Sequence, residues 1–146
     1  MMNQEELKKV LPHRDNMLLV EEAELEEVPD GDGVKLVSHG KYTVKGDEFF
    51  LQGHFPGNPV VPGVILCEMM AQSTCQLFPE VFKNNIMVYR SLDNIKFRGM
   101  VRPGDTCEVV SRLAEQKGCV YVCESKVLVN GRCCAQGRFT VAAVAK

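Results

Sequence analysis

The chain has 146 residues, of which 45% are hydrophobic and 25% charged, and its formal net charge is -2. We expect residues 1–146 to form one globular domain, and the weak charge gives no reason to expect nucleic acid or an anionic membrane as partner. No apolar stretch reaches the ~18 residues of a membrane span, and the N-terminus lacks the pattern of a signal peptide, so a cytoplasmic protein is expected.

The first 45 residues predict a short helix followed by a hairpin. Asn3 and Glu6 can form a capping box for the helix, which Pro12 should end. Residues 17–28 and 34–44 are expected to form antiparallel strands, joined by a turn rich in glycine and aspartate. The second strand keeps the period of two, although a serine and a glycine interrupt its apolar face.

A long loop over residues 46–63 leads into an apolar helix, expected from position 62 or 63 to about Phe78 and ended by Pro79. The rest of the chain is rich in β-forming residues. Strands are expected over 86–92, 95–101, 106–114, 120–129 and 133–144, with a hairpin turn at Asn130-Gly131. The sheet must wrap around the helix to bury it. The predicted fold class is therefore α+β, the hot-dog fold, with one long apolar helix and about six antiparallel strands.

The seven cysteines are best explained as free thiols that act as small hydrophobic side chains. Their number is odd, no C-x-x-C pair occurs, and the three histidines have no zinc-ligand spacing. The sequence therefore implies no metal, and no nucleotide or redox cofactor. Cys67 lies directly beside Glu68, so its modification by thiol reagents is expected to affect activity.

Two titratable residues stand in and just after the loop. His54 lies in a segment stiffened by three prolines, and Glu68 interrupts the apolar helix. Acidic side chains are almost never buried without a partner, and paired titratable groups in different surroundings are typical of acid–base catalysis. Burial in this helix is expected to raise the pKa of Glu68.

Several blocks together resemble one enzyme family, the β-hydroxyacyl-acyl-carrier-protein dehydratases of bacterial fatty-acid synthesis. The likeness spans nearly the whole chain in order. The isomerising branch of the family carries aspartate at the acid position, so the chain resembles the glutamate-type, non-isomerising branch. The blocks are Leu11-Pro12-His13-Arg14, the stretch Gly53-His54-Phe55-Pro56-Gly57-Asn58-Pro59-Val60-Val61-Pro62-Gly63, Glu68, Met70-Ala71-Gln72, Phe97-Arg98 and Val101-Arg102-Pro103-Gly104-Asp105.

The resemblance implies dehydration of 3-hydroxyacyl-acyl-carrier-protein thioesters to trans-2-enoyl thioesters in the fatty-acid elongation cycle. His54 is assigned as the base for the α-proton, and Glu68 as the acid that also holds the departing water. The amide of Gly63, at the start of the helix, is expected to polarise the thioester carbonyl. Gln72 lies one turn beyond Glu68 and either orients its carboxyl or is an amide satisfied in the core.

The family resemblance also implies a homodimer, often a trimer of dimers, in which the histidine of one subunit faces the acid of the other. Lys96, Arg98 and Arg102 either dock the acidic carrier protein with its phosphopantetheine arm or form a solvated strand face. His13 and Arg14 are expected in a structural turn or subunit contact.

Two other functions stay open on the sequence. One is a hot-dog acyl-CoA thioesterase, which needs an acid to activate water. The other is a non-catalytic acyl-binding module, which could dispense with His54 or Glu68. The presence of both residues favours the dehydratase.

Overall fold

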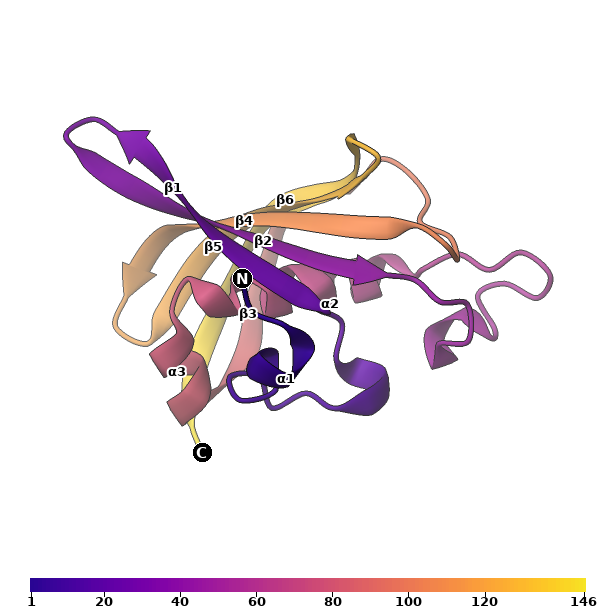
Figure 1. Ribbon diagram of the computed structural model, residues 1–146, viewed down its shortest axis with the longest axis horizontal. Coiled ribbons are helices and arrows are strands. Elements are labelled where there is room, and N and C mark those ends of the chain that lie inside the picture. Colours follow the sequence, from indigo (N-terminus) through magenta and orange to yellow (C-terminus); the bar gives the residue numbers. More distant parts are fainter.

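The computed structural model describes residues 1–146, which form one six-stranded antiparallel sheet with its helices on one side (Figure 1). The strand order is β1-β2-β4-β5-β6-β3, so that β1 and β3 are the edge strands. The strands are β1 (Glu22–Asp30), β2 (Gly33–Thr43), β3 (Asn85–Phe97), β4 (Thr106–Lys117), β5 (Val120–Val129) and β6 (Arg132–Ala145).

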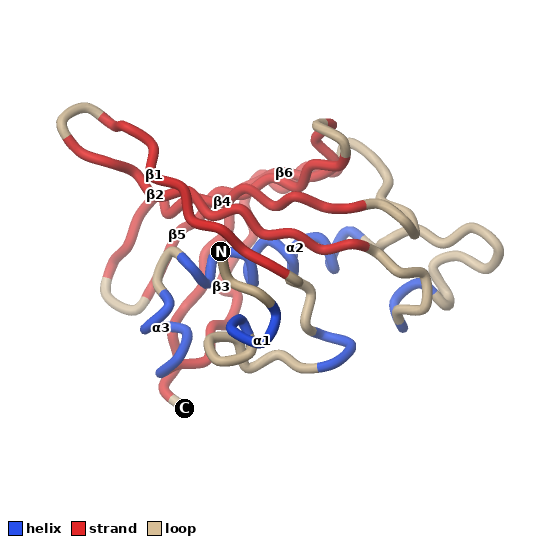
Figure 2. The backbone as a smooth tube through the Cα atoms, in the orientation of Figure 1, coloured by secondary structure: helices blue, strands red, loops and turns tan.

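The central helix α2 (Gly63–Ser73) lies beneath the sheet, between the short helices α1 (Gln4–Leu7) and α3 (Pro79–Asn84) in chain order (Figure 2). Asn3 and Glu6 form the predicted capping box at α1. The hot-dog fold is confirmed. No helix is long and apolar enough to cross a membrane.

Side chains alternate along the strands, and the inward set packs against α2. On β5, the buried residues are separated by half-buried or exposed ones. Met69 and Met70 of α2 are fully buried, as is Phe139 of β6. Helix and sheet thus share one hydrophobic core, which fixes the face of α2 that remains accessible.

Ser38 and Gly40 interrupt the apolar face of β2 because the end of α2 comes very close there. The Ser38 hydroxyl donates a hydrogen bond to the Ser73 carbonyl at 2.6 Å. A Cβ on Gly40 would lie 2.5 Å from the Ser73 hydroxyl oxygen. Small side chains on this strand therefore allow the contact between helix and sheet.

The predicted long helix was wrong in its length. The α-helical part ends at Ser73, a 3-10 turn covers Thr74–Gln76, and Pro79 begins α3. The Thr74 hydroxyl donates to the Ala71 carbonyl at 2.7 Å, in addition to the backbone N–H bonds at the helix end, where the helix tightens into the 3-10 turn. A proline fits the first turn of α3 because its missing N–H would have no partner there.

Two strand predictions also need correction. Residues 17–21 precede β1, and Asp15–Met17 form a 3-10 turn. The two strands expected over 86–92 and 95–101 are a single strand, β3, with a register shift between Asp93 and Lys96. Gly137 on β6 makes room for this irregularity, because a Cβ there would lie 2.8 Å from the Ile95 Cα.

Candidate active site

Glu68 projects from α2 into a cavity of about 230 Å³. The other lining residues are mainly apolar and come from α2, α3, β3, β6 and the segment after α1: His13, Ala71, Gln72, Phe82, Met87, Val88, Tyr89 and Val141. A largely apolar cavity with a few converging polar groups is the usual form of a small-molecule site. Glu68 and His13 are its only titratable groups besides Tyr89.

Gln72 anchors the carboxylate from one helical turn away. Its amide nitrogen donates to Glu68 Oε2 at 2.9 Å and to the Met17 carbonyl at 2.8 Å. Its oxygen accepts from the Leu19 N–H at 2.8 Å, which fixes the orientation of the amide. Gln72 therefore both satisfies the buried backbone and holds Glu68, so the two predicted roles coexist.

His13 is a partner of Glu68 that the sequence analysis placed only in a turn or subunit contact. Its Nε2 lies 3.3 Å from Glu68 Oε2, and each side chain is 25% exposed. His13 Nδ1 is buried without a hydrogen-bond partner. Because Nε2 faces a carboxylate oxygen, which can only accept, Nε2 carries a hydrogen and donates it to Glu68. The sequence feature that could have indicated His13 as a site residue is the block Leu11-Pro12-His13-Arg14, which belongs to the family resemblance.

The expected rise in the pKa of Glu68 was wrong for this chain. Burial does raise the pKa of the carboxyl, but the hydrogen bonds from His13 and Gln72 and the proximity of the imidazole outweigh it. The net pKa lies below the ordinary value. Glu68 is therefore a carboxylate near pH 7, and its oxygens are hydrogen-bond acceptors.

His54 lies in the loop before α2, which extends away from the body of the molecule (Figure 1). Its Nδ1 lies 2.8 Å from the Val60 carbonyl, which can only accept, so Nδ1 carries the hydrogen and Nε2 is the free basic nitrogen. The His54 ring stacks on Phe55 at a centroid distance of 4.2 Å. His54 does not line the Glu68 cavity, so one chain does not bring the two residues into a common pocket.

Gly63 is the first residue of α2, and its N–H has no hydrogen-bond acceptor within the chain. The ring of Phe97 lies directly over it, since a Cβ on Gly63 would be 2.9 Å from Phe97 Cε1. Phe97 is 54% exposed. The free amide and the helix dipole favour a partly negative oxygen at this N–H.

Known proteins match the chain over most of its length. The family model described as ApeI-like, ApeI dehydratase, matches residues 36–138. The 3-hydroxyacyl-[acyl-carrier-protein] dehydratase FabZ of Natranaerobius thermophilus is 39% identical over 144 residues, which cover 97% of this chain and 96% of that protein. FabZ of Streptococcus equi subsp. zooepidemicus is 35% identical, covering 97% and 98%. The chain belongs to the 3-hydroxyacyl-[acyl-carrier-protein] dehydratase family. The resemblance found in the sequence is thus confirmed.

A solved structure supports the fold of this dehydratase family member. The dehydratase heterocomplex ApeI:P from Xenorhabdus doucetiae aligns with a TM-score of 0.72 at 20% identity, covering 96% of this chain and 91% of that chain. At this identity the likeness establishes the hot-dog fold alone.

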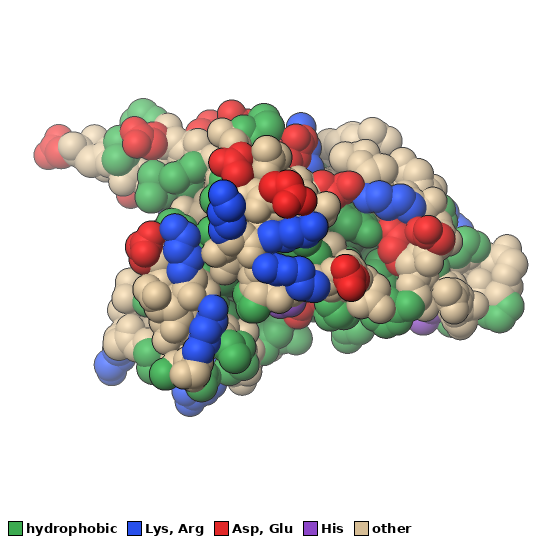
Figure 3. All heavy atoms as spheres, turned by 60° about the horizontal axis from the view of Figure 1, so that its bottom comes forward, with side chains coloured by type: hydrophobic (Ala, Val, Ile, Leu, Met, Phe, Trp, Pro, Cys, Tyr) green, Lys and Arg blue, Asp and Glu red, His purple; other side chains and the backbone are tan.

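The three cationic residues predicted to dock the carrier protein do not share one groove. Lys96 lines a groove of about 790 Å³ across the sheet, together with the cations Arg112, Lys126 and Arg138. Arg98 and Arg102 are exposed outside that groove. Lys and Arg side chains are interspersed with acidic ones over the face shown in Figure 3.

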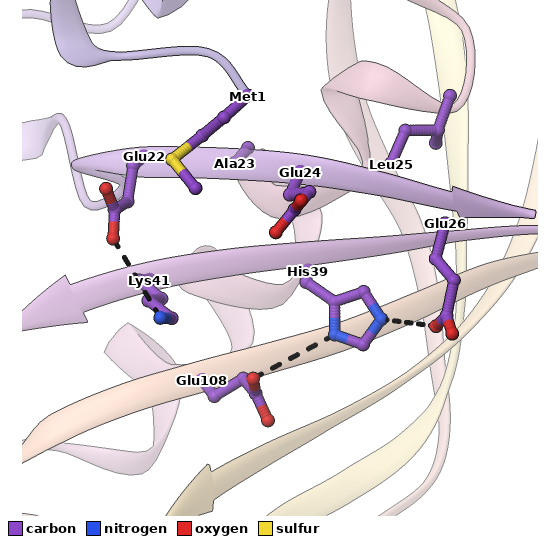
Figure 4. Close-up of a pocket in the computed structure, with 9 residues that line it drawn as sticks. All are labelled: Met1, Glu22, Ala23, Glu24, Leu25, Glu26, His39, Lys41 and Glu108. Carbon is purple, nitrogen blue, oxygen red and sulfur yellow. Dashed lines mark hydrogen bonds and ion pairs between the residues drawn. The ribbon is translucent and has the colours of Figure 1, made fainter.

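His39 lies in a second hollow, on β2 at the outer face of the sheet (Figure 4). Its Nε2 is 2.8 Å from Glu26 Oε1 and its Nδ1 is 3.9 Å from Glu108 Oε2. The His39 side chain is 27% exposed on a solvated face of the sheet, where it also contacts these two acidic residues. No group of residues in the chain has the arrangement of a metal site.

Proposed function

We propose that the protein removes water from 3-hydroxyacyl-acyl-carrier-protein thioesters and forms trans-2-enoyl thioesters in fatty-acid elongation. The observation that carries this proposal is a hydrogen-bonded Glu68 in a largely apolar cavity of a chain that also carries the His54 signature loop. The FabZ names of the relatives support the same reaction. The shared core of sheet and helix supports residues 1–146 as a single domain.

In the proposed reaction, the free Nε2 of His54 takes the α-proton of the substrate. The imidazolium then gives a proton to the 3-hydroxyl as its C–O bond breaks, so one water leaves and the electron pair of the C–H bond forms the double bond. Glu68 accepts a hydrogen bond from the hydroxyl and holds the departing water. The lowered pKa of Glu68 favours this acceptor role over the general-acid role expected from the sequence.

The N–H of Gly63 is proposed to donate to the thioester carbonyl, where negative charge develops when the α-proton is removed. A preorganised donor aimed at a developing oxyanion is among the largest contributions to catalysis. Gln72 has a positioning role, since it acts through Glu68.

The site is proposed to be completed in a homodimer formed along β3. This edge strand exposes apolar side chains: Ile86 is 45%, Val88 42% and Leu92 48% exposed. An exposed apolar edge strand is a ready template for pairing with a second copy. Pairing would let His54 of the partner subunit face Glu68, and three such dimers would give the trimer of dimers that the resemblance implies.

The oligomer is tested by light scattering of the purified chain. Leu92→Lys, on the same edge strand but outside the lining of the Glu68 cavity, should lower the mass towards that of the monomer and abolish hydration activity, because the site needs both subunits. Val34→Lys, at a side chain 62% exposed on β2, is the matched control and should leave both unchanged. A fully active Leu92→Lys monomer would contradict the shared site.

Docking of the acidic carrier protein is proposed at Lys96 and Arg98. The groove beside Lys96 carries three further cations and one acidic residue, Glu124, which favours an acidic partner. Charge reversal at Lys96 and Arg98 should raise KM for carrier-bound substrate but not for a CoA substrate. A cytoplasmic location is proposed because all seven cysteines are free thiols, as is usual in a reducing compartment, and microscopy of a C-terminally tagged chain tests it.

The activity itself is tested by hydration of crotonyl thioester, followed as loss of enoyl absorbance. Removing a general base typically costs ~10²–10⁴-fold in rate, so His54→Ala should lose activity to that extent while remaining folded. Glu68→Gln should also lose activity, because its amide presents one acceptor atom where the carboxylate has two. Release of free thiol by the wild type would instead support a thioesterase, and no reaction at all would support an acyl-binding module.

A further inference from the structure

The tip of the His54 loop, residues 55–58, has one hydrogen bond to another part of the fold. Phe55 and Asn58 close the tip on itself, with N–H to carbonyl distances of 3.1 and 2.9 Å. The tip extends away from the sheet and helices (Figure 2). The tie to the body is the Arg102 side chain, whose Nη1 donates to Asn58 Oδ1 at 2.6 Å.

Arg102 is itself held on a rigid turn. Its N–H donates to Asp105 Oδ2 at 2.8 Å, and the Asp105 N–H donates back to the Arg102 carbonyl at 3.1 Å. The Gly104 N–H donates to the Val44 carbonyl at 2.8 Å, next to the end of β2. Arg102 Nη2 also reaches Met100 Sδ at 3.1 Å. The guanidinium is therefore fixed relative to the sheet.

The same short segment holds the other end of the loop. The Val61 N–H donates to the Val101 carbonyl at 2.8 Å. Next to it, the Val60 N–H donates to the His54 carbonyl at 2.8 Å, while the Val60 carbonyl lies 2.8 Å from His54 Nδ1. Val101 thus supports the stem that orients the imidazole, and Arg102 supports the tip beyond it.

We propose that Arg102 is a positioning residue for the dehydration reaction, which acts through Asn58 to keep the His54 loop in its catalytic geometry. This inference rests on the proposed function. It replaces the carrier-docking role expected for Arg102, because the guanidinium is already engaged within the chain. A residue that docks the carrier protein points its charge towards that protein, whereas the Arg102 guanidinium points towards Asn58 in the His54 loop.

The test compares Arg102→Met, Asn58→Ala and the double variant, using crotonyl-CoA and a carrier-bound substrate. Each single variant should lower kcat about 10-fold on both substrates and leave KM within about 2-fold, since displaced catalytic groups slow the reaction strongly. The double variant should be no slower than the singles, because both substitutions break one hydrogen bond. Arg102→Lys should recover part of the rate. Lys117→Met, at the exposed end of β4, is the control and should retain wild-type kcat.

Hydrogen exchange provides a readout that does not depend on activity. The Val60 amide should exchange about 10-fold faster in Arg102→Met than in the wild type, whereas amides of β5 should be unchanged. If KM rises only for the carrier-bound substrate, Arg102 is a docking residue and the proposal is overturned. Unchanged kcat and unchanged exchange would also overturn it. If the wild type is inactive but the Val60 amide still exchanges faster in Arg102→Met, the proposed dehydratase function is rejected, whereas the role of Arg102 in holding the loop stands.

Discussion

Replacing Gln72 by methionine tests whether this buried amide both stabilises the fold and holds the acidic residue. Gln72 is 1% exposed, and methionine has a similar volume but cannot make its hydrogen bonds. The substitution leaves the Leu19 N–H without its 2.8 Å acceptor and the Met17 carbonyl without its 2.8 Å donor. An unpaired buried group costs about 1–3 kcal/mol, and Leu19 is fully buried while Met17 is half-buried. We therefore expect a loss of about 2–4 kcal/mol in the free energy of unfolding.

Urea unfolding at pH 7 measures this loss, and hydration of crotonyl thioester in the same samples reports on the site. Activity should fall about 10-fold, because Glu68 loses the donor at 2.9 Å that fixes its carboxylate. Gln76→Met is the matched control one turn further along. Gln76 makes one hydrogen bond, to the Ala23 carbonyl at 3.1 Å, and its oxygen is buried without a partner, so less than about 1.5 kcal/mol should be lost. Equal losses in the two variants, or a loss below about 1 kcal/mol for Gln72→Met, would refute the reasoning.

Three further predictions follow from the site. The pKa of Glu68 in the folded protein is below its ordinary value of 4.5, so its ionisation stabilises the fold above that pH. The difference in stability between wild type and Glu68→Gln, measured by thermal melts, should therefore shrink as the pH falls below 4.5. A constant difference would contradict the direction of the pKa shift. Gly63→Ala should displace the Phe97 ring and slow crotonyl hydration about 10-fold; wild-type kinetics would show that the ring moves freely. Exposed Cys119 should react with a thiol reagent before Cys67, whose thiol pKa is raised by burial and by Glu68; mass spectrometry of partly labelled protein decides the order.

The sequence could predict the parts of the site that lie close together in the chain. Gly63 at the start of a helix and Gln72 one turn beyond Glu68 follow from local spacing and helix geometry. The hairpins and the antiparallel sheet follow from alternation and turn residues. These features depend on backbone preferences that each segment carries by itself.

The remaining features depend on contacts between distant segments, which periodicity does not encode. The pairing of His13 with Glu68 joins residues 55 positions apart and reverses the expected direction of the pKa shift. The continuity of β3 depends on Gly137 of a different strand, which leaves space for Ile95. The sequence offers Arg102 as a docking residue or a solvated charge, because its partner Asn58 stands 44 positions earlier and no local pattern joins the two.

The balance of hydrogen bonds around Glu68 determines which chemistry this residue can supply. Burial raises the pKa of the carboxyl, which favours a general acid, whereas the donors His13 and Gln72 lower the pKa, which favours a water-holding acceptor. In the proposed reaction Glu68 is ionised, and the proton that leaves with the hydroxyl comes from the same histidine that removed the α-proton. That proposal needs only one proton carrier, His54, so the rigidity of its loop would be as important as its basicity. A chain that fixes this loop through Val101 and Arg102 and fixes the acid through Gln72 is consistent with that requirement.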